Sequence, residues 1–461
     1  MNAERPIPPH IFRAYDIRGI VGQGLDSDSV ALIGQAIGTE ALALGEHTLL
    51  AGADARLSSP RLSAALIEGI LRSGCNVCDL GVVPTPLLYF GTHTLPTGSG
   101  VMLTGSHNPR EYNGIKIVLQ QRPLADDRIA NIRERIERGE LSTGAGQLSH
   151  YDIVPDYIAR IRGDIQLQRP PRVVLDCGNG VTGKVAPLLY RALGCEVVPL
   201  YCELDGNFPN HHPDPTRAEH LQDLISAVRS SHADLGIAFD GDGDRVGLVT
   251  AAGGIIDNDH LLLAFVQDLL PAHPGARVVY DVKSSHHLER AIRALGGVPV
   301  LCKSGHSFVK HALRESDALL GGEYSAHVFF KHRWFGFDDG MYVGVRFLEL
   351  MDRRHCAAEQ LLQGMPESVS TPELSIPVPE QDKFTLMERV CAGLRLPGAS
   401  LNLLDGVRAD FPHGWGLIRA SNTTPALVLR FEADTATALA AIQALFATEL
   451  RALLPGLPLP L

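Results

Sequence analysis

The stretch Leu189-Tyr-Arg-Ala-Leu-Gly-Cys-Glu-Val197 contains the end of an amphipathic helix, a glycine and the start of a run typical of a β-strand. The same plan recurs in Ile70-Leu-Arg-Ser-Gly-Cys-Asn-Val77 and in Ala291-Ile-Arg-Ala-Leu-Gly-Gly-Val298. A short apolar run precedes each helix, as in Val173-Val-Leu175. Strand, helix and strand in this order indicate a parallel-type sheet, so the repeat predicts three similar α/β domains.

Each repeat is followed by one more predicted strand, which ends in a polar loop that contains glycine. These loops are Thr104-Gly-Ser-His-Asn-Pro109, Asp240-Gly-Asp-Gly-Asp-Arg245 and Gly321-Gly-Glu-Tyr-Ser-Ala-His327. Open α/β sheets bind ligands beyond the carboxyl ends of their strands, so we expect the three loops to carry the chemistry. They can build one site only if the domains face each other.

Domain boundaries follow from the repeat and from a proline-bearing stretch between Met365 and Pro379, beyond which the pattern becomes a smaller α+β segment. We therefore expect mixed-sheet α/β domains at residues 1–152, 153–254 and 255–366, and a C-terminal α+β domain at 367–461. A chain of 461 residues is long enough for several such cores.

The composition of the chain excludes several classes of protein and of binding partner. A hydrophobic fraction of 45% and a charged fraction of 20% are those of a folded protein, and the net charge of −11 argues against a nucleic-acid or anionic-membrane partner. We find no signal-peptide core and no run near the roughly 18 apolar residues of a membrane span. The eight cysteines are scattered, with one close pair at Cys75 and Cys78 on opposite sides of a predicted strand. A reducing cytoplasm is expected.

The loop Asp240-Gly-Asp-Gly-Asp244 predicts a metal site, because three carboxylates this close repel one another unless a cation holds them. Oxygen ligands suit magnesium or calcium. A calcium loop would need glycine at its sixth position and glutamate at its twelfth, where this chain has Arg245 and Ala251.

Ser106 lies in a segment that would also suit an ordinary turn or helix cap. A serine-hydrolase elbow needs glycine at the positions of Thr104 and Asn108, so a hydrolase of that kind is excluded. The remaining active option is a hydroxyl that carries a phosphoryl group.

Two further loops have weaker signals. Glu323, Ser325 and His327 suit neighbouring sugar hydroxyls, although such trios also form satisfied loop networks. Arg419-Ala-Ser-Asn-Thr-Thr-Pro425 suits a phosphate, because an arginine fork stands beside short donors, but a Ser/Thr-rich turn has the same composition.

Together the four loops resemble the α-D-phosphohexomutase family, in particular its bacterial phosphomannomutase/phosphoglucomutase branch. The resemblance covers essentially the whole chain and preserves the order of the loops. It implies four domains around a central cleft, the first three alike, and we expect a monomer. It also implies interconversion of the 1- and 6-phosphates of mannose and glucose through a phosphoserine and a hexose 1,6-bisphosphate, with glucose 1,6-bisphosphate as activator.

The resemblance assigns roles to individual residues. Ser106 is the phosphoserine and, with Asp240, Asp242 and Asp244, holds Mg²⁺; Glu323 and Ser325 bind sugar hydroxyls. The phosphate that is not reacting would be held by Arg419, Ser421, Asn422 and Thr423. Further site residues that the resemblance implies are Tyr15, Arg18, His107, Lys116, Arg245, Lys283, His306 and His327. Among these, Lys116 is the first choice for moving the hydroxyl proton, while Arg18 and His107 would add donors beside the transferred group.

Three alternatives stay open at this point: a phosphoglucosamine mutase, a metal-dependent sugar phosphatase and a non-catalytic sugar-phosphate binding protein. Asn422-Thr423 favours the mannose/glucose branch, since phosphoglucosamine mutases usually carry Gly-Thr there. Tyr324 and Ala326 depart from the Met and Gly of this branch, which affects the expected sugar preference rather than the reaction class.

Overall fold

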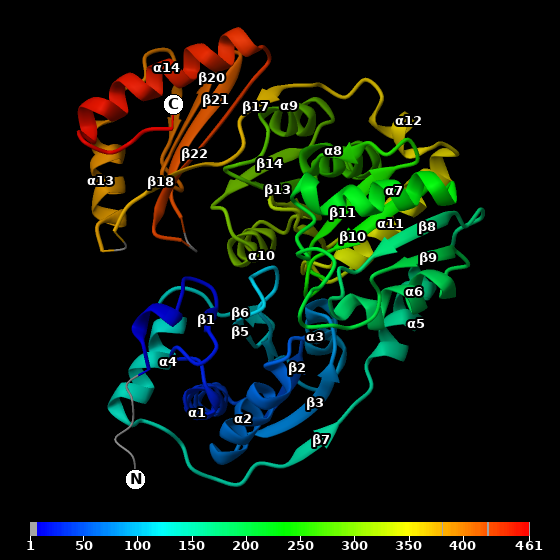
Figure 1. Ribbon diagram of the computed structural model, residues 1–461, viewed down its shortest axis with the longest axis vertical. Coiled ribbons are helices and arrows are strands. Elements are labelled where there is room, and N and C mark those ends of the chain that lie inside the picture. The colour runs from blue at the N-terminus through cyan, green and yellow to red at the C-terminus, as the bar shows by residue number, and fades with distance from the viewer. Residues whose placement is uncertain (1–6, 380, 422–423, 461) are drawn as a thin grey trace. The chain divides into compact units, whose positions relative to one another are not determined.

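The computed structural model describes residues 7–379, 381–421 and 424–460. These residues divide into two compact units, the first within residues 1–258 and 325–361 and the second within residues 259–324 and 362–461. Figure 1 shows the α/β layers and the C-terminal sheet that the sequence predicts, so the expected fold class is confirmed.

The first sheet has seven strands in the order β1-β5-β4-β2-β3-β7, with β6 paired to β5. β2 is parallel to β3 and β4, whereas β5 is antiparallel to β1 and β4. The strands are β1 Ile17–Ile20, β2 Thr48–Ala53, β3 Asn76–Val82, β4 Gly100–Leu103, β5 Tyr112–Leu119, β6 Arg122–Pro123 and β7 Leu148–His150. The helices are α1 Ser27–Ala43, α2 Ser59–Arg72, α3 Thr85–Thr94 and α4 Asp127–Arg138, after a short 3-10 turn at Pro9–Ile11.

Alternate residues of β2 face opposite sides of this sheet, as the pleat requires. Leu49 and Ala51 join a core with α1, α2 and α4. Leu50 faces the other side, where a Cβ on Gly91 of α3 would lie 2.7 Å from its side chain. The sheet is therefore covered by helices on both faces.

The second sheet has the order β12-β11-β10-β8-β9. β8 is parallel to β9 and β10, and β11 is antiparallel to β10, which repeats the arrangement of β5-β4-β2-β3 in the first sheet. Its strands are β8 Arg172–Asp176, β9 Glu196–Leu200, β10 Leu235–Phe239, β11 Val246–Thr250 and β12 Ile255–Ile256. The helices are α5 Val154–Asp164, α6 Ala186–Ala192 and α7 Gln222–Ser231, with 3-10 turns at Val181–Lys184 and Ala218–Leu221.

The third repeat contributes β13 Arg277–Asp281, which is parallel to β14 Val298–Cys302 and to β15 Leu320–Gly322. Its helices α8 Asn258–Leu269, α9 His286–Ala294 and α10 His306–Glu315 accompany them. The short strand β16 Val328–Phe330 and helix α11 Gly340–Arg354 belong to the first unit. Helix α12 Ala358–Leu362 spans its end, since the first unit ends at Leu361. α11 packs on β10 and β11, and the Tyr190 hydroxyl donates to the Met341 carbonyl at 3.1 Å. The division into two compact units follows this packing and does not test the four predicted domains. The domain boundaries near residues 152, 254 and 366 therefore stay a prediction.

The C-terminal sheet is antiparallel, in the order β17-β22-β21-β20-β19 with β18 paired to β22. Its strands are β17 Val369–Ser370, β18 Leu374–Pro377, β19 Ser400–Asn402, β20 Val407–Phe411, β21 Gly414–Ala420 and β22 Ala426–Ala433. Helices α13 Lys383–Gly393 and α14 Ala436–Leu453 lie along one face (Figure 1). Among the described residues, α14 is the one helix long and apolar enough to cross a membrane. Its Ile442, Phe446 and Leu450 are buried in the core of this sheet, which accounts for that apolar character.

All eight cysteines are free thiols. Cys75 is buried, which raises the pKa of its thiol to about 11, and Cys78 lies in β3. A pair that the sequence spacing did not predict is Cys177 and Cys202, whose Sγ atoms lie 3.5 Å apart just beyond the ends of β8 and β9.

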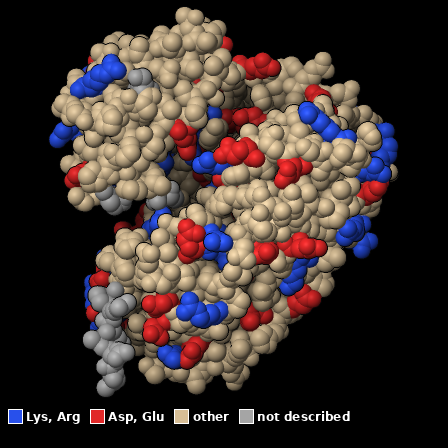
Figure 2. Space-filling model, viewed as in Figure 1, with Lys and Arg blue, Asp and Glu red and all other residues tan. Residues whose placement is uncertain are grey.

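Charged side chains of both signs lie interspersed on the face that Figure 2 shows, singly or in small groups. A surface of this kind agrees with the acidic but mixed composition of the chain.

An aromatic cluster fixes the segment that leads into α11. The Trp334 ring stacks on Tyr342 of α11 at 4.2 Å between centroids and on Phe90 of α3 at 5.8 Å. Tyr157 of α5 meets the same indole edge-on at 6.0 Å. Elements from the first sheet, the second repeat and the third repeat are thus packed together within the first unit.

The buried carboxylate of Asp339 caps the N-terminus of α11. It accepts the Tyr342 N–H at 3.0 Å and the Tyr157 hydroxyl at 2.9 Å. The next residue, Gly340, donates its N–H to the Gly243 carbonyl at 3.0 Å. The cap therefore holds the helix end against the loop that carries the three aspartates.

Burial raises the pKa of Asp339 from 3.8 to about 7. Because the folded-state pKa lies above the unfolded one, the carboxyl contributes most to stability below about pH 4, and this contribution is lost as the pH rises through about 7. Asp339→Asn removes the titration but keeps an acceptor and a good N-cap. We expect the melting temperature of the wild type, relative to that of Asp339→Asn, to fall from about pH 5 to about pH 8 in thermal melts. Asp26→Asn, at the half-buried N-cap of α1, is the matched control. A difference that stays constant with pH would contradict the expectation.

Candidate active site

The loop that carries Ser106 follows β4 and is held by Arg56, a buried residue just beyond β2. Its guanidinium donates to three carbonyl oxygens of the loop, those of Ser106 (2.7 Å), Asn108 (2.6 Å) and Pro109 (2.6 Å). Asp54 accepts from Arg56 Nε at 3.2 Å and from the Gly105 N–H at 3.0 Å. A Cβ on Gly105 would lie 2.4 Å from that guanidinium, so the clamp requires glycine there.

Within this clamp Ser106 adopts the left-handed backbone conformation, with φ of 49°. Such conformations persist where the surrounding contacts impose them. Asp54 and Arg56 were not among the predicted site residues. The feature that could have identified them is their position just beyond the carboxyl end of β2, at the same sheet edge as the Ser106 loop.

The three aspartates of the second loop are buried, with 0%, 0% and 1% exposure, and Asp240 directly follows β10. Ser106 Oγ donates to Asp240 Oδ2 at 2.9 Å, so the serine hydroxyl lies at this carboxylate cluster. Burial and the charges of Asp242 and Asp244 raise the pKa of Asp240 well above its usual range.

One carboxylate oxygen from each aspartate lies within 4.8 Å of the others. Among the described residues, Asp242 Oδ1 and Asp244 Oδ1 are buried without a hydrogen-bond partner. Hard oxygen donors that are deprived of partners fit a divalent cation such as Mg²⁺. The cluster can therefore hold a metal ion, as the sequence predicted.

Lys116 of β5 supplies positive charge to the same cluster. Its buried Nζ lies 2.7 Å from Asp242 Oδ2 and 2.6 Å from Asp244 Oδ2. Burial would lower the pKa of Lys116, but these two carboxylates outweigh it and raise the pKa well above its ordinary value. The charge state favours an electrostatic or proton-donating role over the predicted removal of a proton.

Arg18 and His107 approach Ser106 from other directions. Arg18 of β1 pairs with Asp16 at 2.5 Å and donates to the side-chain oxygen of Asn108. His107 Nδ1 lies 3.1 Å from Ser106 Oγ. Burial and the charges of Arg245 and Arg18 lower the pKa of His107 well below its usual value, so a neutral imidazole stands beside the serine. Tyr15, also predicted, is half-buried in the segment before β1.

His327 joins the end of the third loop to the aspartate cluster. Its Nε2 accepts from Arg245 Nε at 2.9 Å, and its Nδ1 lies 3.1 Å from Asp338 and 3.6 Å from Asp244. The nearby Ser325 Oγ is buried and has no hydrogen-bond partner in the described part of the chain. Asp338 was not predicted as a site residue, because nothing in its sequence context distinguishes it from a surface aspartate.

The remaining predicted residues lie in the second unit. Lys283, just after β13, is buried and pairs with Glu373 at 3.1 Å. Ser304 links two neighbours, since its hydroxyl donates to Glu323 Oε1 at 3.3 Å and its N–H donates to Asp405 Oδ2 at 3.0 Å. Burial would lower the pKa of Lys283, but the surrounding carboxylates raise it above its ordinary value, so the ammonium is charged.

Arg419, near the end of β21, donates from Nε to Asp405 Oδ2 at 2.9 Å. Within the residues that the structure describes, Arg419 Nη2 and Glu323 Oε2 are buried without hydrogen-bond partners.

The other predicted residues of this unit are placed as follows: His306 begins α10, and Ser421 is buried beyond β21. Asn422 and Thr423 lie outside the described residues. Ser304, Glu373 and Asp405 are additional members that short-range sequence patterns did not reveal.

Tyr324 and Ala326 of the third loop, which stand where the family branch has Met and Gly, change the local contacts and the local backbone conformation. Tyr324 lies under the Arg430 guanidinium, 3.5 Å from the ring centroid, and Lys283 Nζ is 5.7 Å from the same ring. An aromatic ring here thus binds a cation face-on. Ala326 has φ of 71°, a left-handed conformation that favours glycine. The backbone conformation at this position is therefore higher in free energy with alanine than it would be with glycine.

The predicted residues thus form two groups. The first unit brings together Tyr15, Arg18, Ser106, His107, Lys116, Asp240, Asp242, Asp244, Arg245, Ser325 and His327. The second unit contains Lys283, His306, Glu323, Arg419 and Ser421. Buried donors and acceptors without partners occur in both groups, as expected for groups that bind a polar ligand.

Comparison with known proteins accounts for nearly the whole chain. Residues 9–143, 155–253 and 257–369 match the descriptions "Phosphoglucomutase/phosphomannomutase, alpha/beta/alpha domain" I, II and III. Residues 373–449 match the C-terminal domain of the same family.

Individual relatives agree with this match. The chain is 51% identical over 454 residues to a phosphomannomutase/phosphoglucomutase of Pseudomonas aeruginosa, covering 98% of both chains. It is 47% identical to a phosphoglucomutase of Neisseria gonorrhoeae, covering 94% of this chain and 95% of the relative. A crystal structure of a phosphoglucomutase/phosphomannomutase family protein from Burkholderia thailandensis has a TM-score of 0.94 at 46% identity, covering 99% of this chain and all of that one. The chain therefore belongs to the phosphoglucomutase/phosphomannomutase family and is an enzyme of the isomerase class.

Proposed function

We propose that the enzyme interconverts the 1- and 6-phosphates of mannose and glucose through a phosphoserine at Ser106 and a hexose 1,6-bisphosphate. The observation that carries this proposal is the 2.9 Å hydrogen bond from Ser106 Oγ to Asp240 Oδ2. It places a nucleophilic hydroxyl against buried carboxylates that fit a divalent cation.

In the first step, the phosphoryl group would leave Ser106 Oγ and form a bond to the free hydroxyl of the substrate. The substrate hydroxyl loses a proton, and the serine oxygen regains one. When bound at the aspartates, Mg²⁺ would neutralise charge on the transferring group. After the bisphosphate turns end for end, the reverse transfer of its other phosphate restores the phosphoserine.

The protein's own charges support this transfer. Arg18, which donates to the Ser106 loop, and the ionised Lys116 place positive charge around the phosphoryl group. The neutral His107, 3.1 Å from Ser106 Oγ, can exchange a proton with that oxygen. We therefore assign proton exchange at the serine to His107 and an electrostatic role to Lys116.

Substrate binding would use the buried polar atoms described above. Glu323 Oε2 and Ser325 Oγ suit two sugar hydroxyls, and Arg419 Nη2 suits the phosphate that is not reacting. The hydroxyls on C3 and C4 exchange places approximately when the sugar turns, so one pair of residues can serve both orientations. Mannose and glucose differ only in the configuration at C2, and these two residues would not contact the C2 hydroxyl.

The proposal extends to the conditions of catalysis. Mg²⁺ would be the metal and glucose 1,6-bisphosphate the activator, in a cytoplasmic enzyme that acts as a monomer on small hexose phosphates. A phosphoglucosamine mutase is the alternative substrate class, and the Asn422-Thr423 pair and the relatives named above both favour mannose and glucose over it.

The first test separates a mutase from a phosphatase. We expect the wild type, with Mg²⁺ and glucose 1,6-bisphosphate, to convert both glucose 1-phosphate and mannose 1-phosphate to their 6-phosphates without releasing equivalent inorganic phosphate. Ser106→Ala should lower kcat by at least about 1,000-fold, because the group that accepts the phosphoryl is removed. Ser59→Ala, whose hydroxyl donates to Asp54 in the clamp, is a control for damage to the loop. Full turnover by Ser106→Ala, or stoichiometric phosphate release, would refute the proposal.

A second prediction concerns the metal. Chelation should abolish turnover, and added Mg²⁺ should restore it. Asp242→Asn should lower kcat by about 100-fold or more, because it removes a ligand from the charge-stabilising site. Circular dichroism should show an unchanged fold, and Asp223→Asn, an exposed carboxylate that accepts from Tyr201, is the control. Unchanged turnover in thoroughly chelated enzyme would show that the cluster needs no metal.

A third prediction concerns the arginine fork. Arg419 Nε is already bound to Asp405, and its buried Nη2, which has no hydrogen-bond partner among the described residues, is available to a phosphate. Arg419→Ala should cost on the order of 2–4 kcal/mol in kcat/KM and increase the dependence on added glucose 1,6-bisphosphate. Arg419→Lys should recover only part of the loss, because an ammonium cannot bind Asp405 and the phosphate as a planar fork does. Arg389→Ala, on the exposed side of α13, should change neither value. Wild-type kinetics for Arg419→Ala would return this loop to the role of an ordinary turn.

A further inference from the structure

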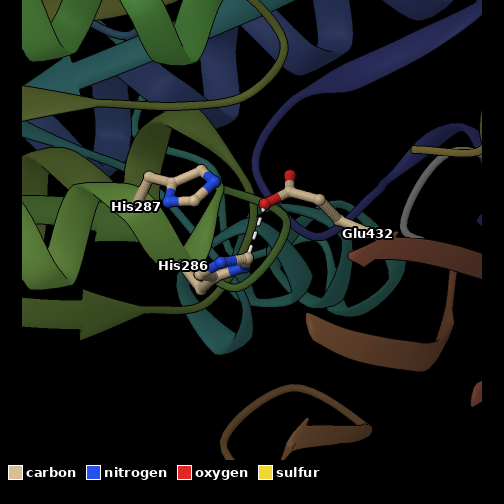
Figure 3. Close-up of side chains that lie close together, drawn as sticks. All are labelled: His286, His287 and Glu432. Carbon is tan, nitrogen blue, oxygen red and sulfur yellow. Dashed lines mark ion pairs between the residues drawn. The ribbon is translucent and has the colours of Figure 1, made fainter. Parts of the chain in front are cut away.

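His286 and His287 begin helix α9, and Glu432 lies on β22, within the same compact unit. Figure 3 shows the two imidazoles turned toward the Glu432 carboxylate from α9. One ligand-type atom from each of the three residues lies within 4.8 Å of the others. None of the three belongs to the groups that the proposed reaction uses.

The nitrogens that face this point lack ordinary partners. In the described part of the chain, His286 Nδ1 and His287 Nε2 are buried and make no hydrogen bond. His286 Nδ1 nevertheless lies 3.1 Å from Glu432 Oε1, off the direction of a hydrogen bond. Two buried imidazole nitrogens beside a carboxylate are an unusual arrangement unless something binds between them.

Neighbouring groups orient the three side chains. His286 Nε2 contacts Asp434 Oδ1 at 3.1 Å, so a proton on Nε2 leaves the lone pair on Nδ1 available to a metal ion. Ser285 Oγ donates to Glu432 Oε1 at 2.6 Å and accepts the His287 N–H at 3.2 Å, which caps α9. A carboxylate behind a metal-binding histidine is the usual outer partner of such a site.

The charges also permit a cation. The Glu432 carboxylate is buried, accepts from Ser285 Oγ and lies near Arg430, and these neighbours favour its ionised form. Arg430 Nη2 lies 3.8 Å from the other carboxylate oxygen, Oε2. The exposed Arg290 lies 3.8 Å from Asp434. Two carboxylates therefore face two arginines, and the imidazoles add ligands without adding charge when neutral.

We propose that His286, His287 and Glu432 bind Zn²⁺, through His286 Nδ1, His287 Nε2 and one carboxylate oxygen, with water completing a tetrahedral site. Imidazole and carboxylate ligands suit zinc, whereas the all-oxygen aspartate cluster suits Mg²⁺. Zinc bonds of about 2.0–2.2 Å separate tetrahedral ligands by roughly 3.4 Å. His286 Nδ1 and Glu432 Oε1 are already 3.1 Å apart, and the ligand atoms of all three residues lie within 4.8 Å, so only a small movement of the side chains is needed.

The site would tie α9 to β22, the strand that follows the Arg419 loop. A bound ion would therefore link the third repeat to the C-terminal sheet inside the second unit. Without metal, the contacts of His286 with Glu432 and Asp434 make part of this link, but they give His287 Nε2 no partner among the described residues.

The test measures zinc binding by the full-length enzyme, stripped with chelator and exchanged into excess Mg²⁺. We expect equilibrium dialysis to show one more zinc per wild-type chain than per His287→Gln chain, and an affinity at this site weakened by more than about 100-fold in the variant. His311→Gln, an exposed histidine on α10, should retain the full zinc content. Zinc should also raise the melting temperature of the wild type and of His311→Gln more than that of His287→Gln.

A second measurement uses Co²⁺, whose visible absorption distinguishes tetrahedral from octahedral coordination. We expect intense tetrahedral bands in the wild type and their loss in His286→Gln and His287→Gln. If a variant fails to fold, the wild-type spectrum alone decides. Equal zinc content in all proteins, or a wild-type spectrum without tetrahedral bands, would overturn the proposal.

Discussion

Three aspartates buried on one short loop repel one another, and the rest of the first unit is arranged to offset that repulsion. Lys116 reaches the cluster from the first sheet and pairs with two of the carboxylates. His327 reaches it from the end of the third loop, together with Arg245. Two carboxylate oxygens still lack partners among the described residues, which leaves a place for a divalent cation.

Contacts around the cluster keep these groups in place. Arg56 holds the backbone of the Ser106 loop through three carbonyl oxygens, so that the serine hydroxyl meets Asp240. The cap at Asp339 and the stack of Trp334 on Tyr342 hold α11 against the aspartate loop. Catalytic geometry of this kind depends on supporting contacts as much as on the reacting groups. These contacts hold α11, which belongs to the third repeat, on the second sheet beside the aspartate loop.

The repeat of helix, glycine and strand sufficed to predict the α/β sheets, because its periodicity is local and recurs three times. It also led to the aspartate cluster, since carboxylates held this close along the chain need a compensating cation. Asp54 and Arg56 escaped prediction because their partners in the Ser106 loop lie about 50 residues away in the chain. Asp338 escaped because its role depends on the packing of the third repeat against Asp244 of the second. His286 and Glu432 are likewise 146 positions apart, and the thiols of Cys177 and Cys202 meet only because β8 and β9 pair side by side. Sequence spacing also could not show that Lys116 is held in its charged form by two carboxylates.

The central claim is that Ser106 carries the phosphoryl group at the aspartate cluster, and its location on the chain can be measured directly. The enzyme would be incubated with Mg²⁺ and glucose 1,6-bisphosphate, quenched, digested and analysed by peptide mass spectrometry. The account predicts one phosphoryl group, located on Ser106, in the wild type, and a much lower occupancy in Asp240→Asn, which alters the partner of the serine hydroxyl. A phosphoryl group on any other residue, or none on Ser106 in enzyme that turns over, would contradict it.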